Sequence, residues 1–357
     1  MPTSGIFTAM PLGARRTFRL SLTTAIALVI AYALQLPLPF LAPLFAILLT
    51  LKPAPPIGIK GLLKVILAVV ITLSSGLLVT PLLVHYDILG VMLVGIGIYF
   101  STYLSLAREN AAIIGTLLTL GITLISAAGV ASSALSIMVI QGIAIGIVIA
   151  TISQWLVYPF FPEDQPAGVQ PVPADAWKSD FNWIALRTTL IVMPVYLLVL
   201  TNPSAYMPLM MKSTILAQQA SLAHAKSAGK ELLIATLLAG LLAVLIWFGL
   251  KLAVNLWMFF LWISLCGLYI AAKFYRVLPS RFGPVFWQDV FVTLLIILGP
   301  AVQDSANGKD VYAAFFVRMG LFIALTLYAW LAVYAMEQLR TWRQQTGMPA
   351  TVDEDFI

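Results

Sequence analysis

Long apolar runs alternate with short polar stretches along almost the whole chain. A helix needs about 20 apolar residues to cross a bilayer, and backbone groups in lipid must find their hydrogen-bond partners within the same segment. The runs therefore predict membrane helices, six before a polar, proline-rich connector and six after it. The expected spans are 17–36, 38–51, 62–83, 88–106, 111–129 and 135–158 in the first half, and 183–200, 205–222, 231–250, 255–273, 285–302 and 311–335 in the second.

These segments predict an all-α integral membrane protein of about 12 transmembrane helices, arranged as two parallel six-helix repeats. When Arg19 is placed over Arg187, Gly61 falls over Gly229 at the same offset. Six crossings in each half give both halves the same orientation, so the axis that relates them runs along the membrane normal. The expected parts are an N-terminal repeat at 1–160, a cytoplasmic connector at 161–180, a C-terminal repeat at 181–338 and a cytoplasmic tail at 339–357.

Composition agrees with a membrane location. Of the 357 residues 61% are hydrophobic and 10% are charged, whereas soluble domains carry about 25% charged residues. The net charge of +6 is explained by orientation in a membrane, and it does not require nucleic acid as a partner. Lysine and arginine gather in alternate connections, which the positive-inside rule assigns to the cytoplasm. We therefore expect a bacterial inner-membrane protein with both termini in the cytoplasm.

The second segment of each half is expected to be short or broken. Sixteen helical residues reach about 24 Å, less than the ~30 Å of the hydrocarbon layer, and prolines remove backbone donors. Short or interrupted segments at corresponding positions of two repeats indicate a substrate site. The prolines that carry this prediction are Pro37, Pro39 and Pro43 in the first half and Pro203 and Pro208 in the second.

A polar stripe in the stretch "AYMPLMMKSTILAQQASLAHAK" is the main candidate site. Lys212 and Gln219 share one helix face, and Thr214 and Gln218 lie on the neighbouring face. A charged lysine near the middle of a bilayer costs at least ~2.5–3.5 kcal/mol, so such a residue normally faces a cavity or a partner. We interpret these four residues as a substrate-binding set; the alternative is that Lys212 extends its side chain to the outer interface.

Three further positions complete the candidate residues. Arg318 lies about two turns inside the last segment and is assigned to substrate binding, with a structural pair to Asp289 or Asp304 as the alternative. Asp289 is the candidate for proton coupling, although an interfacial or ion-paired carboxylate remains open. The sequence Arg108-Glu109-Asn110 is a polar cytoplasmic turn and the candidate gate.

The balance of these residues favours an anionic substrate, because two cationic side chains stand without an equal set of buried acids. Met207, Met210 and Met211 add polarisable surface suited to flat apolar rings. With the cytoplasm negative, a monovalent anion moving outward gains ~2.3 kcal/mol per 100 mV. The sequence contains no GxxxxGK[ST] run, no cluster of histidines and thiols around its single cysteine, and no pattern that requires a cofactor or a metal.

The opening "RRTFRLSLTTAIALVIAYALQLPLPFLAPLFAILLTL" and the six-plus-six apolar pattern resemble the fusaric acid resistance / aromatic acid exporter (FUSC-like) family, in its compact branch. The resemblance covers residues 12–340 and implies an inner-membrane exporter of aromatic carboxylic acids, often paired with a periplasmic membrane fusion adaptor protein. Larger members carry sizeable cytoplasmic domains after each half, whereas the connector expected here is about twenty residues long and the tail is about as short. The family pattern assigns no individual functional residues.

We therefore expect an efflux transporter for small anionic, aromatic carboxylic compounds, driven by the membrane potential or a proton gradient. A gated anion channel and a non-transporting scaffold subunit of an envelope export complex are the alternatives, and a homo-oligomer remains open. An intramembrane enzyme is not expected, because the apolar segments offer no clustered acids or histidines.

Overall fold

All regular structure in the described part of the chain is helical. The computed structural model describes residues 10–51, 54–107, 112–164, 181–220, 225–306, 308 and 311–346. Within these ranges the side chains of residues 112–113, 204–205, 215–220, 225–229, 306, 311, 313, 337, 340–341 and 343–346 are not described.

Six helical segments form the first half, and each corresponds to one predicted span. One of them, formed by α5, η2 and α6, runs without a break through a π-helical turn at η2. The segments are α1 (Leu12–Ala33), α2 (Leu41–Thr50), α3 (Ile59–His85), α4 (Asp87–Ala107), the segment of α5 (Ala112–Leu120), η2 (Gly121–Ile125) and α6 (Ser126–Ala131), and α7 (Ser133–Val157).

Six more segments form the second half, again one for each predicted span. Their starts follow local sequence signals: the Asn255 side chain accepts a hydrogen bond from the Met258 N–H at the start of α11, and α12 begins at a proline. The segments are α8 (Phe181–Thr201), α9 (Pro203–Ala220), α10 (Ala225–Leu252), α11 (Leu256–Phe274), α12 (Pro284–Ala306) and α13 (Val311–Thr346).

The prediction of short or broken second segments is confirmed for α2, whereas α9 is unbroken but, at about 27 Å, still shorter than the ~30 Å hydrocarbon layer. Helix α2 has 10 residues, or about 15 Å, but α9 is continuous over 18 residues. Two prolines are compatible with this continuity. Pro203 is the first residue of α9, where a missing N–H costs nothing, and Pro208 lies in the second turn, where one backbone hydrogen bond is lost near the helix start.

Nine of the described helical segments are long and apolar enough to cross a membrane: α3, α4, the α5–η2–α6 segment, α7, α8 and α10 to α13. Helices α1, α2 and α9 are not among them. The most buried of the nine is α12, with 83% of its most apolar window inside the protein, whereas the windows of α3, α4 and α13 are 28% buried. The chain therefore has a central group of helices and a peripheral group, as expected for a multi-pass membrane protein.

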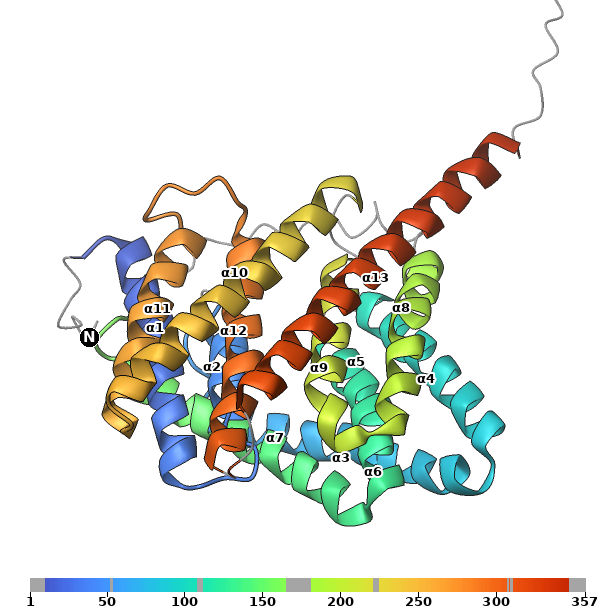
Figure 1. Ribbon diagram of the computed structural model, residues 1–357, viewed down its shortest axis with the longest axis horizontal. Coiled ribbons are helices and arrows are strands. Elements are labelled where there is room, and N and C mark those ends of the chain that lie inside the picture. Colours follow the sequence, from blue (N-terminus) through green and yellow to red (C-terminus); the bar gives the residue numbers. More distant parts are fainter. Residues whose placement is uncertain are drawn as a thin grey trace, which may run out of the picture.

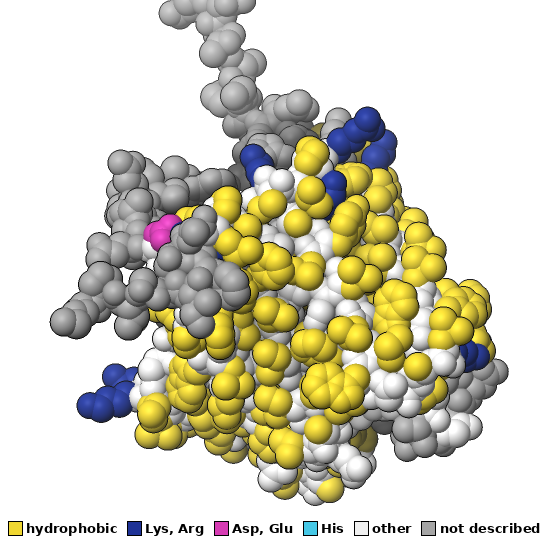
Figure 2. Space-filling view, turned by 90° about the vertical axis from the view of Figure 1, so that its left-hand side faces the viewer, with side chains coloured by type: hydrophobic (Ala, Val, Ile, Leu, Met, Phe, Trp, Pro, Cys, Tyr) yellow, Lys and Arg dark blue, Asp and Glu magenta, His cyan; other side chains and the backbone are white. Residues whose placement is uncertain are grey.

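Peripheral helices present apolar stripes to the outside. On α10 the exposed side chains recur every three or four residues, at Ile234, Leu237, Leu241, Leu245 and Phe248, which is one face of a helix. The face shown in Figure 2 is covered largely by hydrophobic side chains, and lysine and arginine lie toward its margins. Such a belt is the surface expected of a protein in contact with lipid.

The first helix of each half packs against a helix of the other half. Helix α1 packs against α11 of the second half, and α8 packs against α4 of the first half, so that these two pairs lie at opposite edges of the molecule (Figure 1). Between them, α12 contacts both α2 and α9, and α9 also contacts the α5–η2–α6 segment. Within the first half the approach of α3 to η2 is very close: a Cβ atom on Gly76 would lie 2.1 Å from the Gly121 carbonyl oxygen.

Candidate functional site

A cavity of about 240 Å³ lies between the two halves, at the end of the helices where α2, α9 and α13 begin. We call this the cavity end, and we call the opposite end, where α1 and α8 begin and α7 ends, the connector end. Both halves contribute to the cavity wall, which follows from the central position of α2, α9 and α12. Its lining residues are Pro37, Leu38, Phe40, Leu41, Leu124 and Val139 from the first half and Met207, Pro208, Met211, Pro300, Gln303, Asp304 and Arg318 from the second.

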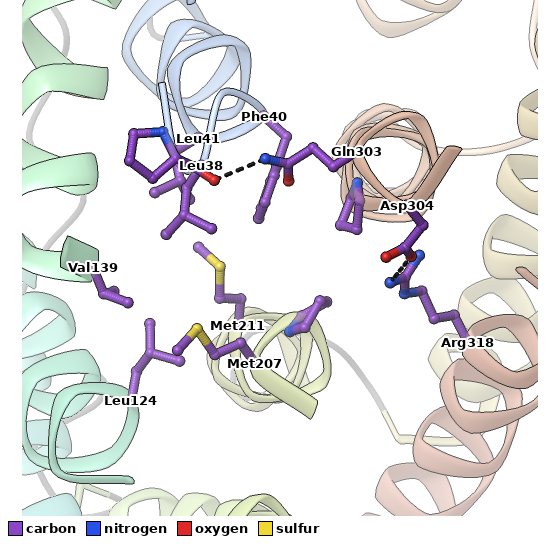
Figure 3. Close-up of a pocket in the computed structure, with 13 residues that line it drawn as sticks. Leu38, Phe40, Leu41, Leu124, Val139, Met207, Met211, Gln303, Asp304 and Arg318 are labelled. Carbon is purple, nitrogen blue, oxygen red and sulfur yellow. Dashed lines mark hydrogen bonds and ion pairs between the residues drawn. The ribbon is translucent and has the colours of Figure 1, made fainter. Parts of the chain in front are cut away.

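Most of the cavity wall is apolar. Figure 3 shows Leu38, Leu41, Leu124 and Val139 on the side of the first half, with the thioether groups of Met207 and Met211 between the two halves. Thioether sulfur is polarisable and makes favourable contacts with aromatic rings. This part of the wall suits a flat apolar group.

The segment between α1 and α2 is held in place by α12. The Gln303 side-chain amide donates a hydrogen bond to the Pro37 carbonyl oxygen at 2.8 Å. Phe40 packs directly against Gly299, where a Cβ atom would lie 2.2 Å from the Phe40 Cβ. Because glycine leaves this space free, the start of α2 comes close enough to α12 to close one side of the cavity.

Arg318 and Asp304 form the charged edge of the cavity (Figure 3). Arg318 Nη2 donates to Asp304 Oδ2 at 2.5 Å, and the side chains are 17% and 11% exposed. Arg318 Nη1 is buried and has no hydrogen-bond partner among the described residues. One donor of the guanidinium group is therefore left for a ligand, since a buried donor without a partner is costly.

Lys212 and Asp289 form a second ion pair, which lies outside the cavity. Lys212 Nζ donates to Asp289 Oδ1 and to Thr293 Oγ1, both at 2.5 Å, and the two charged side chains are 0% exposed. Met211, the neighbour of Lys212 on α9, lines the cavity. The pair therefore joins α9 to α12 directly beside the cavity, in the most buried part of the protein.

One oxygen atom of this second ion pair has no hydrogen-bond partner among the described residues. Asp289 Oδ2 is buried and has no partner among the described residues, and Thr293 lies one helical turn after Asp289, on the same face of α12. A buried carboxylate normally has its lone pairs satisfied. One oxygen of this buried carboxylate is therefore left without a partner among the described residues.

The structure changes the interpretation of the two cations. Arg318 lines the cavity, and it also forms the ion pair with Asp304 that the sequence left open as the structural alternative. Lys212 does not face the cavity, contrary to expectation, because its ammonium group is enclosed by Asp289 and Thr293. The premise that the two cations lack an equal set of buried acids is wrong, since each has its own carboxylate.

Of the other predicted residues, Thr214 is the one whose side chain is described, and it does not line the cavity. Thr214 is buried, and its hydroxyl donates to the Met210 carbonyl oxygen within α9. Gln218 and Gln219 belong to the last turn of α9, and their side chains are outside the described residues. The candidate gate, Arg108-Glu109-Asn110, lies between α4 and α5 and is likewise outside the described part.

Sequence reasoning missed several members of the site. The hydroxyl of Thr293 could have been found from its four-residue spacing to Asp289. The first-half wall, formed by residues such as Leu38 and Leu124, carries no chemical signal in the sequence, because ordinary apolar residues line it. Met207 and Met211 do line the cavity as expected, whereas Met210 is fully buried and does not.

Comparison with known families gives a match to the first half of the chain. The family model described as "Protein of unknown function (DUF2955)" matches residues 16–157, and this domain is in general associated with FUSC-like membrane proteins. The matched stretch begins within α1 and ends at the last residue of α7. Among curated proteins and among solved structures, no match to the chain is found.

Proposed function

We propose that the chain is an inner-membrane exporter of small anionic compounds with an aromatic body, driven by the membrane potential or by a proton gradient. The observation that carries the proposal is the cavity between the halves, in which an arginine edge faces a methionine-rich apolar wall. Many transporters bind their substrates at the interface between two repeats.

The pattern of helix contacts supports two equivalent halves. If α1 to α4 correspond to α8 to α11, the α5–η2–α6 segment to α12, and α7 to α13, most of the contacts recur. The α1·α2 contact is matched by α8·α9, and the cross-half contact α1·α11 by α8·α4. The match of the known domain to residues 16–157 is consistent with a unit boundary after α7. Two like-oriented halves that pack on one central cavity are the architecture that rocking-type transport requires.

The size of the cavity limits the substrate class. A volume of about 240 Å³ is below the ~300–1,000 Å³ of sites for drug-sized ligands, so a compound with about one ring fits best. The free Nη1 of Arg318 provides a donor for one carboxylate oxygen, because guanidinium groups bind carboxylates through paired donors. Asp304 shares this guanidinium group, so a bound anion competes with an internal carboxylate.

The Lys212–Asp289 pair is the candidate for proton coupling. Ionisable groups inside membrane helices are by default functional, and they mark proton and substrate pathways. Protonation of Asp289 removes the negative charge that Lys212 needs in a fully buried position, so the contact between α9 and α12 would weaken. Since Met211 on α9 lines the cavity, such a change is transmitted to the substrate site.

Transport by the purified chain tests the proposal. We expect liposomes that contain the wild-type chain to release labelled benzoate, and we expect Arg318→Gln to slow the initial rate about tenfold or more. Lys251→Gln is the matched control: it removes one positive charge at the same end of the molecule, from an exposed lysine that donates to the Tyr312 hydroxyl. Its rate should stay at the wild-type value.

Each alternative has its own outcome in this assay. No flux from the wild-type chain, at any pH gradient or potential, would favour the scaffold subunit and end the transport proposal. Flux that is unchanged in Arg318→Gln would show that the cavity is not the route. Rates that rise linearly with benzoate concentration without saturation would favour a gated anion channel over a carrier.

A further inference from the structure

A second charged cluster lies at the connector end, far from the cavity along α1. The residues that follow α7 fold back onto the start of α1, and there two acids meet three arginines. Arg16 Nε donates to Glu163 Oε1 at 2.7 Å, Arg16 Nη2 donates to the same oxygen, and Arg19 Nη2 donates to Glu163 Oε2 at 2.7 Å. Both oxygens of the Glu163 carboxylate are thus held between two guanidinium groups.

Arg15 plays a different part in this cluster. It binds Asp164 through two contacts of 2.9 and 2.8 Å, and it also donates to the backbone carbonyl oxygens of Pro162 (3.0 Å) and Met10 (3.1 Å). Arg15 therefore ties the backbone of the two segments together. This tie does not involve Glu163, so the attachment of the chain after α7 does not depend on the Glu163 carboxylate.

Arg19 has binding capacity that the protein does not use. Its side chain is 4% exposed, its Nη1 has no hydrogen-bond partner among the described residues, and it lines a small pocket together with Thr50, Gln154 and Tyr158. The Tyr158 ring lies 5.8 Å from Arg19 Cζ. The pocket has a volume of about 10 Å³, room for about one water molecule, so the free donor of Arg19 is the feature that is open to a ligand.

The cluster also carries an excess of positive charge, since three guanidinium groups face two carboxylates in its described part. Burial by itself would raise the pKa of Glu163, but hydrogen bonds and charges from Arg19 and Arg16 outweigh this effect and lower the pKa. Glu163 is therefore held as a carboxylate anion. The Arg16 side chain is 27% exposed and that of Asp164 is 60% exposed, so the edge of the cluster is open to solvent.

From this geometry we propose that Arg16 and Arg19 form a second binding site, specific for a small carboxylate, which the chain's own Glu163 occupies until a free anion displaces it. The guanidinium groups already hold a carboxylate through both of its oxygens. The edge of the cluster at Arg16 is open to solvent, so the body of a displacing ligand would lie outside the protein. Arg15 keeps the segment attached when Glu163 leaves. The site lies at the other end of the molecule from Arg318, so its occupancy is independent of the cavity.

Binding of benzoate to the full chain in phosphatidylcholine nanodiscs, measured by calorimetry, tests this site. All variants carry Arg318→Gln, so that the cavity does not contribute. We expect Glu163→Gln to bind benzoate at least about tenfold more tightly than the parent, because the internal competitor is neutral. Asp164→Asn is the matched control: it releases Arg15 alone and should give no gain.

The reversal experiment adds Arg16→Gln and Arg19→Gln to Glu163→Gln, and the gain should disappear. Equal benzoate affinity in Glu163→Gln and the parent, or a gain that survives loss of both arginines, would overturn the proposal. Should Glu163→Gln fail to fold, Glu163→Asp keeps the charge but shortens its reach, and a smaller gain is expected; no gain in that variant is equally negative.

Two further comparisons complete the experiment. The first identifies the source of the bound anion, and the second separates this site from the proposed transport function. If phosphatidylglycerol in the nanodisc abolishes the gain, a lipid phosphate occupies the arginines and the assignment to a free carboxylate is wrong. Because the measurement is binding at equilibrium, it is independent of transport: absence of benzoate flux would defeat the proposed function and leave this site standing, and the converse also holds.

Discussion

The two ion pairs of the second half differ in their access to solvent, although both join a basic residue to an aspartate of α12. Lys212–Asp289 is completely enclosed, whereas the side chains of Arg318 and Asp304 keep 17% and 11% of their surface exposed. An enclosed pair depends on its own partners because no water can replace them. A pair at a cavity edge can exchange partners with a ligand at low cost.

This difference assigns different tasks to the pairs. Lys212, Asp289 and Thr293 hold α9 against α12, and a change in their charge alters helix packing. Arg318 keeps one donor without a partner beside an apolar wall, so under the proposed function it is the residue that would bind substrate. The enclosed pair is thus suited to coupling and the open pair to binding.

The largest effect is expected for Asp289→Ala. Removal of one partner leaves the Lys212 ammonium group buried without compensation, which typically costs about 3–5 kcal/mol. Thermal unfolding in detergent should show a large drop in Tm.

The combined variant Lys212→Met with Asp289→Leu is its control. Replacement of both charges by apolar groups is often neutral or stabilising, so stability should return while any effect of a pH gradient on benzoate flux is lost. If the double variant is as unstable as Asp289→Ala, the enclosed pair is not the cause of the loss.

A smaller effect is expected for Thr293→Val. The variant keeps the side-chain shape but removes one acceptor from the Lys212 ammonium group, and hydrogen bonds to charged groups contribute about 1.5–3 kcal/mol. Thr236→Val serves as the comparison, since that buried hydroxyl donates to the Leu232 carbonyl oxygen and its loss should cost about 1 kcal/mol. Equal losses in the two variants, measured by thermal unfolding, would contradict the role of Thr293.

Arg318→Gln should reduce stability less than either change around Lys212, by roughly 1 kcal/mol. The reason is that its partner Asp304 is partly exposed and takes part in a further interaction. The comparison between the pairs fails if the Tm of Arg318→Gln falls as far as that of Asp289→Ala. Taken with the flux assay, the expected result is a variant that folds nearly normally and transports poorly.

The smallest effect concerns pH and the connector-end cluster. Because the folded-state pKa of Glu163 is lowered from its ordinary value of 4.5, its contribution to stability is complete above pH 4.5 and is lost as the pH falls through the lowered value. The Tm of the wild type should therefore approach that of Glu163→Gln on acidification below 4.5. A constant difference in Tm across that range would contradict the ionised Glu163–arginine contact.

The helices could be predicted from the sequence because apolar run length alone fixes them. All twelve predicted spans correspond to helical segments, including the 10-residue α2. Two details depend on tertiary structure and escaped prediction. Helix α9 stays continuous through Pro208, and the central segment of the first half widens into a π turn at Gly121–Ile125, where α3 approaches it closely.

The sequence identified individual charged residues of the site, but it did not show which of them pair with one another. Lys212, Arg318 and Asp289 were each recognised because a charge inside an apolar run is unusual. Their partners lie on other helices, 77 residues apart in sequence for Lys212 and Asp289, and helical spacing gives the face of a residue but not what it meets. The contact of Arg16 and Arg19 with Glu163 had one signal in the sequence. A pair of acids follows the last span of the first half, at the same membrane depth as the three arginines at the start of the first span.

Helix α13 carries Arg318 near its start and continues to Thr346, well past the rest of the bundle (Figure 1). The stretch from Arg318 to Thr346 is about 42 Å long at 1.5 Å per residue. A tilt of about 5° around the cavity would displace the far end by roughly 4 Å. A fluorophore attached near the end of α13 would therefore test whether binding at the cavity tilts this helix.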